Sequence, residues 1–404
     1  MKSDDYISKY ASDKGSLSNT IGSKYVSKMK KINKVGDMSL KGNIKKKIKD
    51  AGKIKNYFLN KDIKYNLDSR IFYYNHIRKK IKNISSNQCL SASISGNAAN
   101  TTYSIKDTIM LTRRFGTSSE YGYVYIAKIK NEIGKRPIAA KLMVRNYRNL
   151  LETSLNEKIT KEIVKSKISR HFILTYKVIY CNTISNINLP NIINNDKYII
   201  LLNELARGDY KSLCLKKDFL KNNEVLYNIF IQMMLSIMTL HSFGYVHRDC
   251  HWGNFLYQYN NEKGYYQYRI NGKVYYLKSC DYSIYLYDFG IAKKISEAPI
   301  KNIAEDYVRI TGAFRNKNNY NHSWLSKINI ANNLPSKDIS VFALNFKNKI
   351  INLEKNNITG KDAFLNKITQ ELIDVFLKIP NNIFTDKKPL NAKIINAGTF
   401  NIDN

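Results

Sequence analysis

The stretch Tyr245–Asn254, with the sequence YVHRDCHWGN, constrains this chain most, because it places an acid, a carboxamide and two imidazoles in one short loop. His247, Arg248, Asp249 and Asn254 fit the pattern H-R-D-x-x-x-x-N. In this pattern the aspartate accepts or orients a hydroxyl proton, and the asparagine holds a metal ion. Four matched residues occur by chance in roughly one chain of this length in 400, so the surrounding motifs must support the prediction.

A second acidic motif follows in the order that such a site requires. Ile284–Tyr287 is an apolar run that predicts a strand, and Asp288, Phe289 and Gly290 come directly after it. An aspartate in this position binds a metal ion. We therefore predict that Asp288 and Asn254 are metal ligands.

Three short apolar runs, Ile109–Phe115, Tyr121–Ile129 and Pro137–Val144, predict strands that are joined by turns. The last run contains Lys141 after three apolar residues. Such a lysine faces inward, and its ammonium group needs an anion.

Residues 149–169 predict a helix in which Glu157 lies within an apolar stripe. A buried glutamate needs a cation, and Lys141 is the obvious one. The opposite side of this helix is also apolar, so its periodicity does not exclude Glu152 or Glu162 as the partner of Lys141.

The rest of the chain alternates further strands and helices. A polar link that contains Gly208 follows the strand 197–202 and predicts a hinge between two lobes. The other predicted strands are 175–181 and 255–259, and the predicted helices are 222–243, 302–310, 338–353 and 360–379.

Residues 1–104 are rich in Lys, Ser, Asn and Gly, which predicts a basic and partly disordered extension. Aromatic and aliphatic residues within 54–84 predict a short helix or strand that docks on a neighbouring domain. The beginning of the chain shows no apolar signal segment, and no stretch approaches eighteen uncharged apolar residues. We expect a cytoplasmic protein without a transmembrane segment.

The chain carries 66 Lys and Arg against 32 Asp and Glu, which gives a net charge of +34. This charge favours an anionic partner such as nucleic acid, a membrane surface or an acidic protein. Lys, Asn, Ile and Tyr are enriched throughout, however, so the charge can equally reflect biased composition and a solvated lysine surface. The five cysteines have no paired spacing, which predicts reduced thiols.

Together these motifs resemble the protein kinase superfamily over about residues 105–300. The segment 115–124 is similar to the glycine-rich loop G-x-G-x-x-G-x-V, with Thr117 and Ser119 at its first two glycine positions, and 138–141 is similar to V-A-I-K. The string 155–158 is similar to the signature of the family's αC helix and favours Glu157. His251, the insertion before D-F-G, the missing A-P-E and the basic extension most resemble the virion-associated serine/threonine kinases of poxviruses.

The resemblance implies an α+β, bilobal fold with a small β-rich N-lobe and a larger, mainly helical C-lobe. It divides the chain into an extension (1–104), an N-lobe (105–203), a C-lobe (204–390) with a hairpin insertion at about 258–282, and a tail (391–404). The implied catalytic residues are Asp249, His251, Arg248 and His247. The implied nucleotide contacts are Gly116, Thr117, Ser119, Gly122, Val124, Lys141, Glu157 and Glu204.

The cofactors implied are ATP and Mg²⁺, with Mn²⁺ as a substitute. The implied activity is phosphorylation of serine or threonine in viral structural or membrane proteins. The resemblance places this activity in virion assembly in the host cytoplasm, with the enzyme packaged in the virion.

One residue departs from the family pattern. Ordinary serine/threonine kinases have a lysine two residues after the catalytic aspartate, where this chain has His251. An imidazole is a cation only when it is protonated. The pattern H-x-D-x-H-x-x-N also resembles small-molecule phosphotransferases of the aminoglycoside and choline type, and the missing A-P-E favours these. Such an enzyme and a non-catalytic basic scaffold remain the alternatives.

Overall fold

The structure is a computed structural model that describes residues 65–401, except 88, 95–100, 120–121, 131–136, 182–196, 217, 316–334, 357 and 359. The described residues belong to one compact unit, Ile48–Asn404. Residues 1–64 of the predicted extension therefore lie outside the described residues. The N-lobe of this unit ends with strand β7 (Tyr198–Glu204), and its C-lobe begins with strand β8 (Gly208–Asp209).

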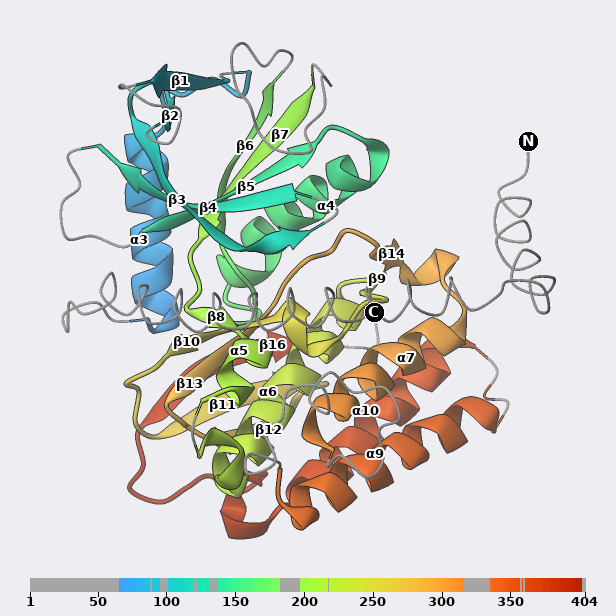
Figure 1. The fold of residues 1–404 in the computed structure, drawn as a ribbon. Coiled ribbons are helices and arrows are strands. Elements are labelled where there is room, and N and C mark those ends of the chain that lie inside the picture. The colour runs from blue at the N-terminus through green and yellow to red at the C-terminus, as the bar shows by residue number, and fades with distance from the viewer. Residues whose placement is uncertain are drawn as a thin grey trace, which may run out of the picture. The chain divides into compact units, whose positions relative to one another are not determined.

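A seven-stranded antiparallel sheet forms the N-lobe, in the order β1-β2-β3-β4-β5-β7-β6 (Figure 1). Strands β3 to β7 confirm the strands predicted from apolar runs. Strands β1 and β2 pair with Leu90 opposite Ile105, so the lobe begins before the predicted boundary at residue 105. The seven strands are β1 (Leu90–Ile94), β2 (Thr101–Ile105), β3 (Ile109–Ser119), β4 (Gly122–Ile129), β5 (Ile138–Val144), β6 (Thr175–Cys181) and β7 (Tyr198–Glu204).

Two helices pack beside this sheet (Figure 1). Helix α3 (Leu67–Lys80) is the docking element predicted within residues 54–84. Helix α4 (Tyr147–Lys158) begins where the side chain of Asn146 accepts a hydrogen bond from the backbone N–H of Asn149, and it continues as a π-helix (Ile159–Val164). These two segments account for the helix predicted at 149–169.

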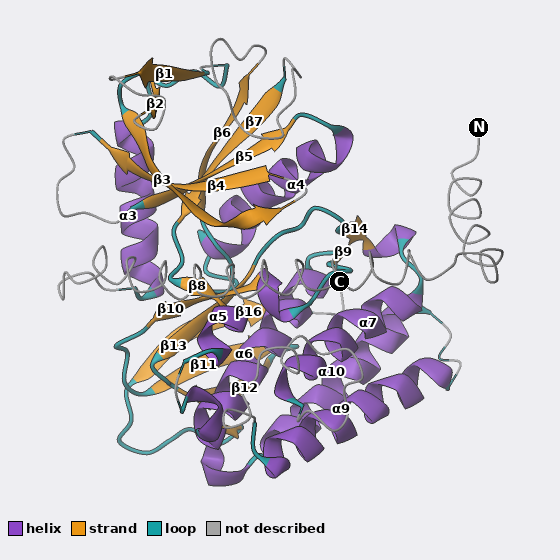
Figure 2. Ribbon diagram, viewed as in Figure 1, coloured by secondary structure: helices purple, strands orange, loops and turns teal. Residues whose placement is uncertain are grey.

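Helices dominate the C-lobe (Figure 2). The predicted helices are confirmed with boundaries shifted by a few residues, and a short helix, α5, was not predicted. Among the described helices, only α6 is long and apolar enough to cross a membrane, and most of it is buried within the lobe. The helices are α5 (Tyr210–Cys214), α6 (Asn223–Ser242), α7 (Ile300–Thr311), α9 (Lys337–Lys355) and α10 (Lys361–Leu377).

Three small sheets complete the C-lobe. The predicted insertion is a hairpin that turns at Asn271-Gly272, where both residues have positive φ. The predicted tail contains strand β16, which pairs parallel to β11 and makes the hairpin part of a four-stranded sheet. The strands are β8 (Gly208–Asp209), β9 (Tyr245–Val246), β10 (Phe255–Tyr259), β11 (Tyr265–Ile270), β12 (Lys273–Lys278), β13 (Tyr282–Leu286), β14 (Lys293–Lys294), β15 (Phe384–Thr385) and β16 (Ile394–Phe400).

One buried arginine joins α3 to the end of β7. The guanidinium of Arg70 donates to both carboxylate oxygens of Glu204, at 2.9 Å (Nε to Oε1) and 2.8 Å (Nη2 to Oε2). It also donates to the carbonyl oxygen of Arg170 at 2.8 Å, from Nη1. Arg70 and Glu204 are 1% and 6% exposed, so the charges of both are buried together.

This pair predicts a large loss of stability in Arg70→Met, because Glu204 would remain buried without its cation. We expect the free energy of unfolding to fall by roughly 3–5 kcal/mol in a denaturant titration. Asp68→Asn, which removes the exposed pair of the same helix with Lys167, is the control and should cost less than about 1 kcal/mol. Equal effects of the two substitutions would contradict the assigned role of Arg70.

Candidate active site

A buried carboxylate on α7 holds the loop that carries Asp249. The two oxygens of Asp306 accept the backbone N–H groups of His247 at 2.7 Å and Arg248 at 2.6 Å. Its Oδ2 also lies 3.0 Å from Nε2 of His241 on α6. Burial would raise the pKa of Asp306, but its hydrogen bonds, that of His241 foremost, lower it. Sequence reasoning predicted the helix but missed the role of Asp306.

Three side chains surround the carboxylate of Asp249. Arg309 on α7 lies 2.9 Å from Oδ1, and the side-chain amide of Asn254 donates to Oδ2 at 3.3 Å. Nε2 of His251 lies 3.6 Å from Oδ2. Asp249 is partly exposed, so its carboxylate is both oriented by neighbours and accessible to solvent.

His251 has the hydrogen bonds of a neutral imidazole. Its Nδ1 accepts the backbone N–H of Gly253 at 2.9 Å, which places the proton on Nε2, toward Asp249. Burial lowers the pKa of His251, the negative charge of Asp249 opposes this effect, and the positive charge of Arg309 adds to it. The predicted catalytic residue thus lies beside Asp249, with the Nε2–Oδ2 distance of 3.6 Å beyond hydrogen-bond range.

His247 and Arg248 connect the loop to the D-F-G segment. His247 is fully buried, accepts the N–H of Asp249 at Nδ1 (3.2 Å) and donates from Nε2 to the carbonyl of Tyr287 (3.0 Å). Nη1 of Arg248 donates to the carbonyl of Ile291 at 3.2 Å. These contacts make both residues positioning groups.

The two predicted metal ligands lie beside each other. The backbone N–H of Tyr287, which precedes Asp288, donates to the carbonyl of Asn254 at 3.0 Å. Nδ2 of Asn254 donates to the carbonyl of Asp249 at 2.9 Å, so its amide oxygen lies at the opposite end of the group. Asp288 is 41% exposed at its side chain. A carboxylate and an amide oxygen are donors that Mg²⁺ prefers, so these residues fit that ion.

The partner of Lys141 is Glu152, and the predicted pairing with Glu157 is wrong. Nζ of Lys141 lies 2.6 Å from Oε1 of Glu152 and 3.3 Å from Oδ1 of Asp288. Burial would lower the pKa of Lys141, but the two carboxylates raise it above its usual value. Glu157 is exposed, because α4 packs through the face that buries Glu152 and Leu155 and leaves Glu157 outside that face.

Helix α4 also contacts the D-F-G segment directly. Nε of Arg148 donates to the carbonyl of Gly290 at 2.7 Å. Glu152 is buried, and its Oε2 has no hydrogen-bond partner within the described residues. The position of α4 therefore determines both the partner of Lys141 and the placement of Gly290.

A family model described as the ABC1 atypical kinase-like domain matches residues 163–320, which include the loop of Asp249, the D-F-G segment and Asp306. The match covers less than half of the chain and begins after Lys141 and Glu152. With the two-lobed fold it supports membership of the protein-kinase-like superfamily. This chain contains a kinase-like domain. No curated protein is similar enough to the chain to count as a relative.

The α+β, bilobal fold predicted for this kinase-like domain is confirmed. Its predicted glycine-rich loop is the β3–β4 hairpin, where Ser119 pairs with Gly122. Gly116 and Thr117 also lie in β3, and Val124 pairs with Phe115; the side chains of 115–119 lie outside the described set.

A side chain on Gly122 would lie 2.2 Å from the carbonyl of Leu142, so packing against β5 already requires glycine there. Glu204 was predicted to contact the nucleotide. Its carboxylate is instead bound by Arg70, and its N–H donates to the carbonyl of Leu174, so this side chain is a structural group of the hinge.

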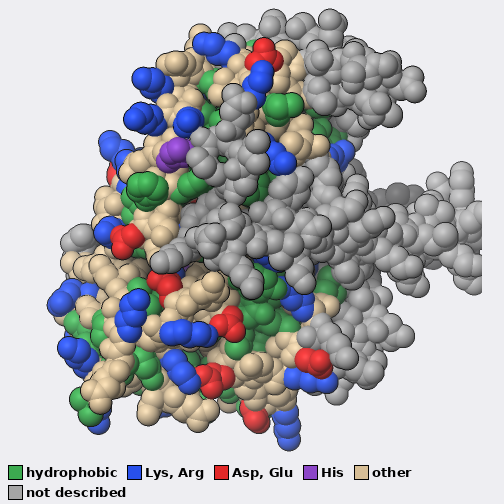
Figure 3. Space-filling model, turned by 90° about the vertical axis from the view of Figure 1, so that its left-hand side faces the viewer, with side chains coloured by type: hydrophobic (Ala, Val, Ile, Leu, Met, Phe, Trp, Pro, Cys, Tyr) green, Lys and Arg blue, Asp and Glu red, His purple; other side chains and the backbone are tan. Residues whose placement is uncertain are grey.

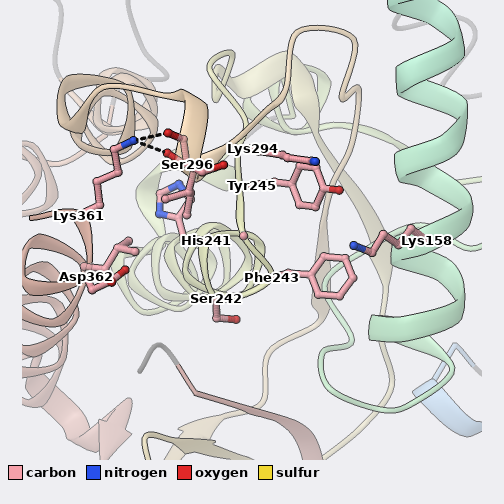
Figure 4. A pocket seen from close by; sticks show the side chains of 12 residues that line it. Lys158, His241, Ser242, Phe243, Tyr245, Lys294, Ser296, Lys361 and Asp362 are labelled. Atoms are coloured by element: carbon pink, nitrogen blue, oxygen red, sulfur yellow. Dashed lines mark hydrogen bonds between the residues drawn. The ribbon is translucent and has the colours of Figure 1, made fainter. Parts of the chain in front are cut away.

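A separate cavity of about 580 Å³ lies beside the segment that follows D-F-G (Figure 4). Lys158, Tyr245 and Lys361 contribute to its lining, which contains none of the predicted site residues. Nζ of Lys361 donates to the carbonyls of Ile295 (2.8 Å) and Ser296 (2.7 Å). Helix α10 therefore holds the post-D-F-G segment of the kinase-like domain through backbone oxygens.

The corrected pairing predicts different effects of two glutamate substitutions. Glu152→Gln should lower phosphoryl transfer at least about tenfold, because Lys141 loses its nearer carboxylate. Glu157→Gln should stay within about twofold of wild type, since Glu157 is exposed. Initial rates at saturating ATP give the comparison, and a larger loss for Glu157→Gln would indicate that Glu157 is the functional partner of Lys141.

Proposed function

We propose that this domain transfers the γ-phosphoryl group of ATP to serine and threonine hydroxyls of proteins. The observation that supports this most is that a buried cation, a carboxylate and an amide of the types that bind Mg²⁺, and a partly exposed carboxylate lie in one site. Lys141 lies 3.3 Å from Asp288, and Asn254 lies 3.3 Å from Asp249. Phosphoryl transfer depends mainly on positioning and on neutralising charge, and these residues supply both.

Each residue has a part in the proposed reaction. The acceptor oxygen forms a bond to the γ-phosphorus as the bond from that phosphorus to the β,γ-bridging oxygen breaks, and its electron pair leaves with ADP. Asp249 orients the acceptor hydroxyl and takes its proton, which then passes to solvent. Lys141, which Glu152 keeps protonated and in place, binds phosphate oxygens.

Asp288 and Asn254 would hold Mg²⁺, which when bound neutralises phosphate charge. Asn254 is fixed for this by its bonds to the backbone of Asp249 and Tyr287. Asp288 has a positive φ of 67°, a conformation that non-glycine residues rarely adopt and that often marks functional sites. The pKa of Asp288 is lowered by Lys141 foremost, so its carboxylate is charged and ready to bind a cation.

A small hydroxyl compound is the second candidate acceptor. It is favoured by His251 in place of lysine and by the absence of A-P-E from the sequence after Gly290. The viral setting, with structural or membrane proteins as substrates in the host cytoplasm and the enzyme packaged in the virion, is proposed from the sequence resemblance alone.

An anionic partner is proposed from the net charge of +34. On the face in Figure 3, Lys and Arg side chains are spread over both lobes and are interspersed with acidic ones. This distribution supports a solvated basic surface more than one defined binding patch on that face.

Purified protein, labelled ATP and three acceptors test the proposal: a basic protein, an acidic protein and an aminoglycoside. We expect label on serine or threonine of a protein. Asp249→Asn and Asp288→Ala should lower kcat by roughly 10² or more with the fold retained, because they remove the proton acceptor and a metal ligand.

Label on the aminoglycoside alone would favour the second candidate. No transfer to any acceptor, or activity of both variants within tenfold of wild type, would contradict the proposed function.

A further inference from the structure

The catalytic loop itself brings no permanent positive charge to the acceptor side of Asp249. Its second residue after Asp249 is His251, whose Nδ1 accepts a backbone N–H, so the ring is a neutral donor. The guanidinium of Arg248 is directed to the carbonyl of Ile291, in the segment after D-F-G. The transition state of phosphoryl transfer spreads negative charge over the phosphoryl oxygens, and cations beside it accelerate the reaction.

Helix α7 places a guanidinium at this position. Nη2 of Arg309 lies 2.9 Å from Oδ1 of Asp249, and Nη1 donates to the carbonyl of Arg248 at 3.2 Å. The planar guanidinium group thus contacts two successive residues of the loop at once, which an ammonium group cannot do. Arg309 is 51% exposed, so its charge faces the open side of the site as well as Asp249.

The position of Arg309 follows from buried contacts one turn earlier on the same helix. Asp306 is buried and accepts the N–H groups of His247 and Arg248, which fixes α7 against the loop. Residues three apart on a helix lie on the same face, so Arg309 is directed toward the same loop. Its place beside Asp249 is therefore determined by the fold.

We propose that Arg309 is a catalytic residue that supplies, from α7, the positive charge beside the transferred phosphoryl group that His251 does not supply. In the transfer described above, its guanidinium orients Asp249 through Oδ1 and neutralises the phosphoryl oxygens as the acceptor bond forms. This inference rests on the proposed phosphoryl transfer. It explains how a loop without the usual lysine can still serve this reaction.

Four variants and a control test the role of this charge. Arg309→Gln should lower kcat roughly 10²-fold and leave the KM for ATP within about twofold. Arg309→Lys should retain more than about a tenth of the activity. Arg269→Gln, on an exposed arginine of β11 that donates to Gly272, is the control and should match wild type.

The decisive comparison uses a variant in which a lysine restores a positive charge to the loop. The double variant Arg309→Gln/His251→Lys should have a kcat at least about tenfold above that of Arg309→Gln, because it again has a cation beside Asp249, and His251→Lys alone is the reference for this comparison. A purely structural role of Arg309 would not be rescued in this way.

Two results would overturn the inference while the proposed function stands. One is an Arg309→Gln variant within threefold of an active wild type. The other is a double variant no more active than Arg309→Gln. A wild type that transfers no phosphoryl group to any acceptor would overturn both proposals.

Discussion

The buried ammonium of Lys141 is the constraint on which the site depends. A charge this far from water is stable only beside carboxylates, and Glu152 and Asp288 approach it from different lobes. A buried Lys141 in β5 therefore requires helix α4 to pack with Glu152 directed inward. It also requires the D-F-G segment to lie beneath the sheet. Because these contacts are mutually dependent, a displacement of α4 would separate Lys141 from its anion and disturb Gly290 through Arg148.

The loop that carries Asp249 depends on a second buried charge, Asp306. Its carboxylate accepts hydrogen bonds from two backbone N–H groups of the loop, which would otherwise need water, and it also contacts His241. These contacts hold the loop against both α6 and α7. Helix α7, which carries Asp306, also places Arg309 beside Asp249. Lys141 and Asp249 thus have separate anchors, and these two parts of the site meet where Asn254 bonds to the backbone of Asp249 and Tyr287.

Local motifs predicted most of the strands, the long helices and the residues at the centre of the site. The errors arose where distant packing decides the outcome. Both sides of α4 are apolar, so periodicity could not choose between Glu152 and Glu157. The apolar Leu155, three residues after Glu152, was the available signal, and the structure buries both. The role of Asp306 depends on a partner loop far away in sequence. Strands in 90–105 and 394–400 gain stability only from pairing, which weakly apolar sequence does not reveal.

We propose that Lys141, Asp288 and Asn254 form one site for ATP with Mg²⁺. Isothermal titration of the purified chain with ATP tests it most directly, with and without Mg²⁺, and in parallel on Asp288→Asn. We expect one ATP per chain, an affinity that falls at least about tenfold without Mg²⁺, and little response to Mg²⁺ in the variant. An affinity that ignores Mg²⁺ and is unchanged in Asp288→Asn would contradict it.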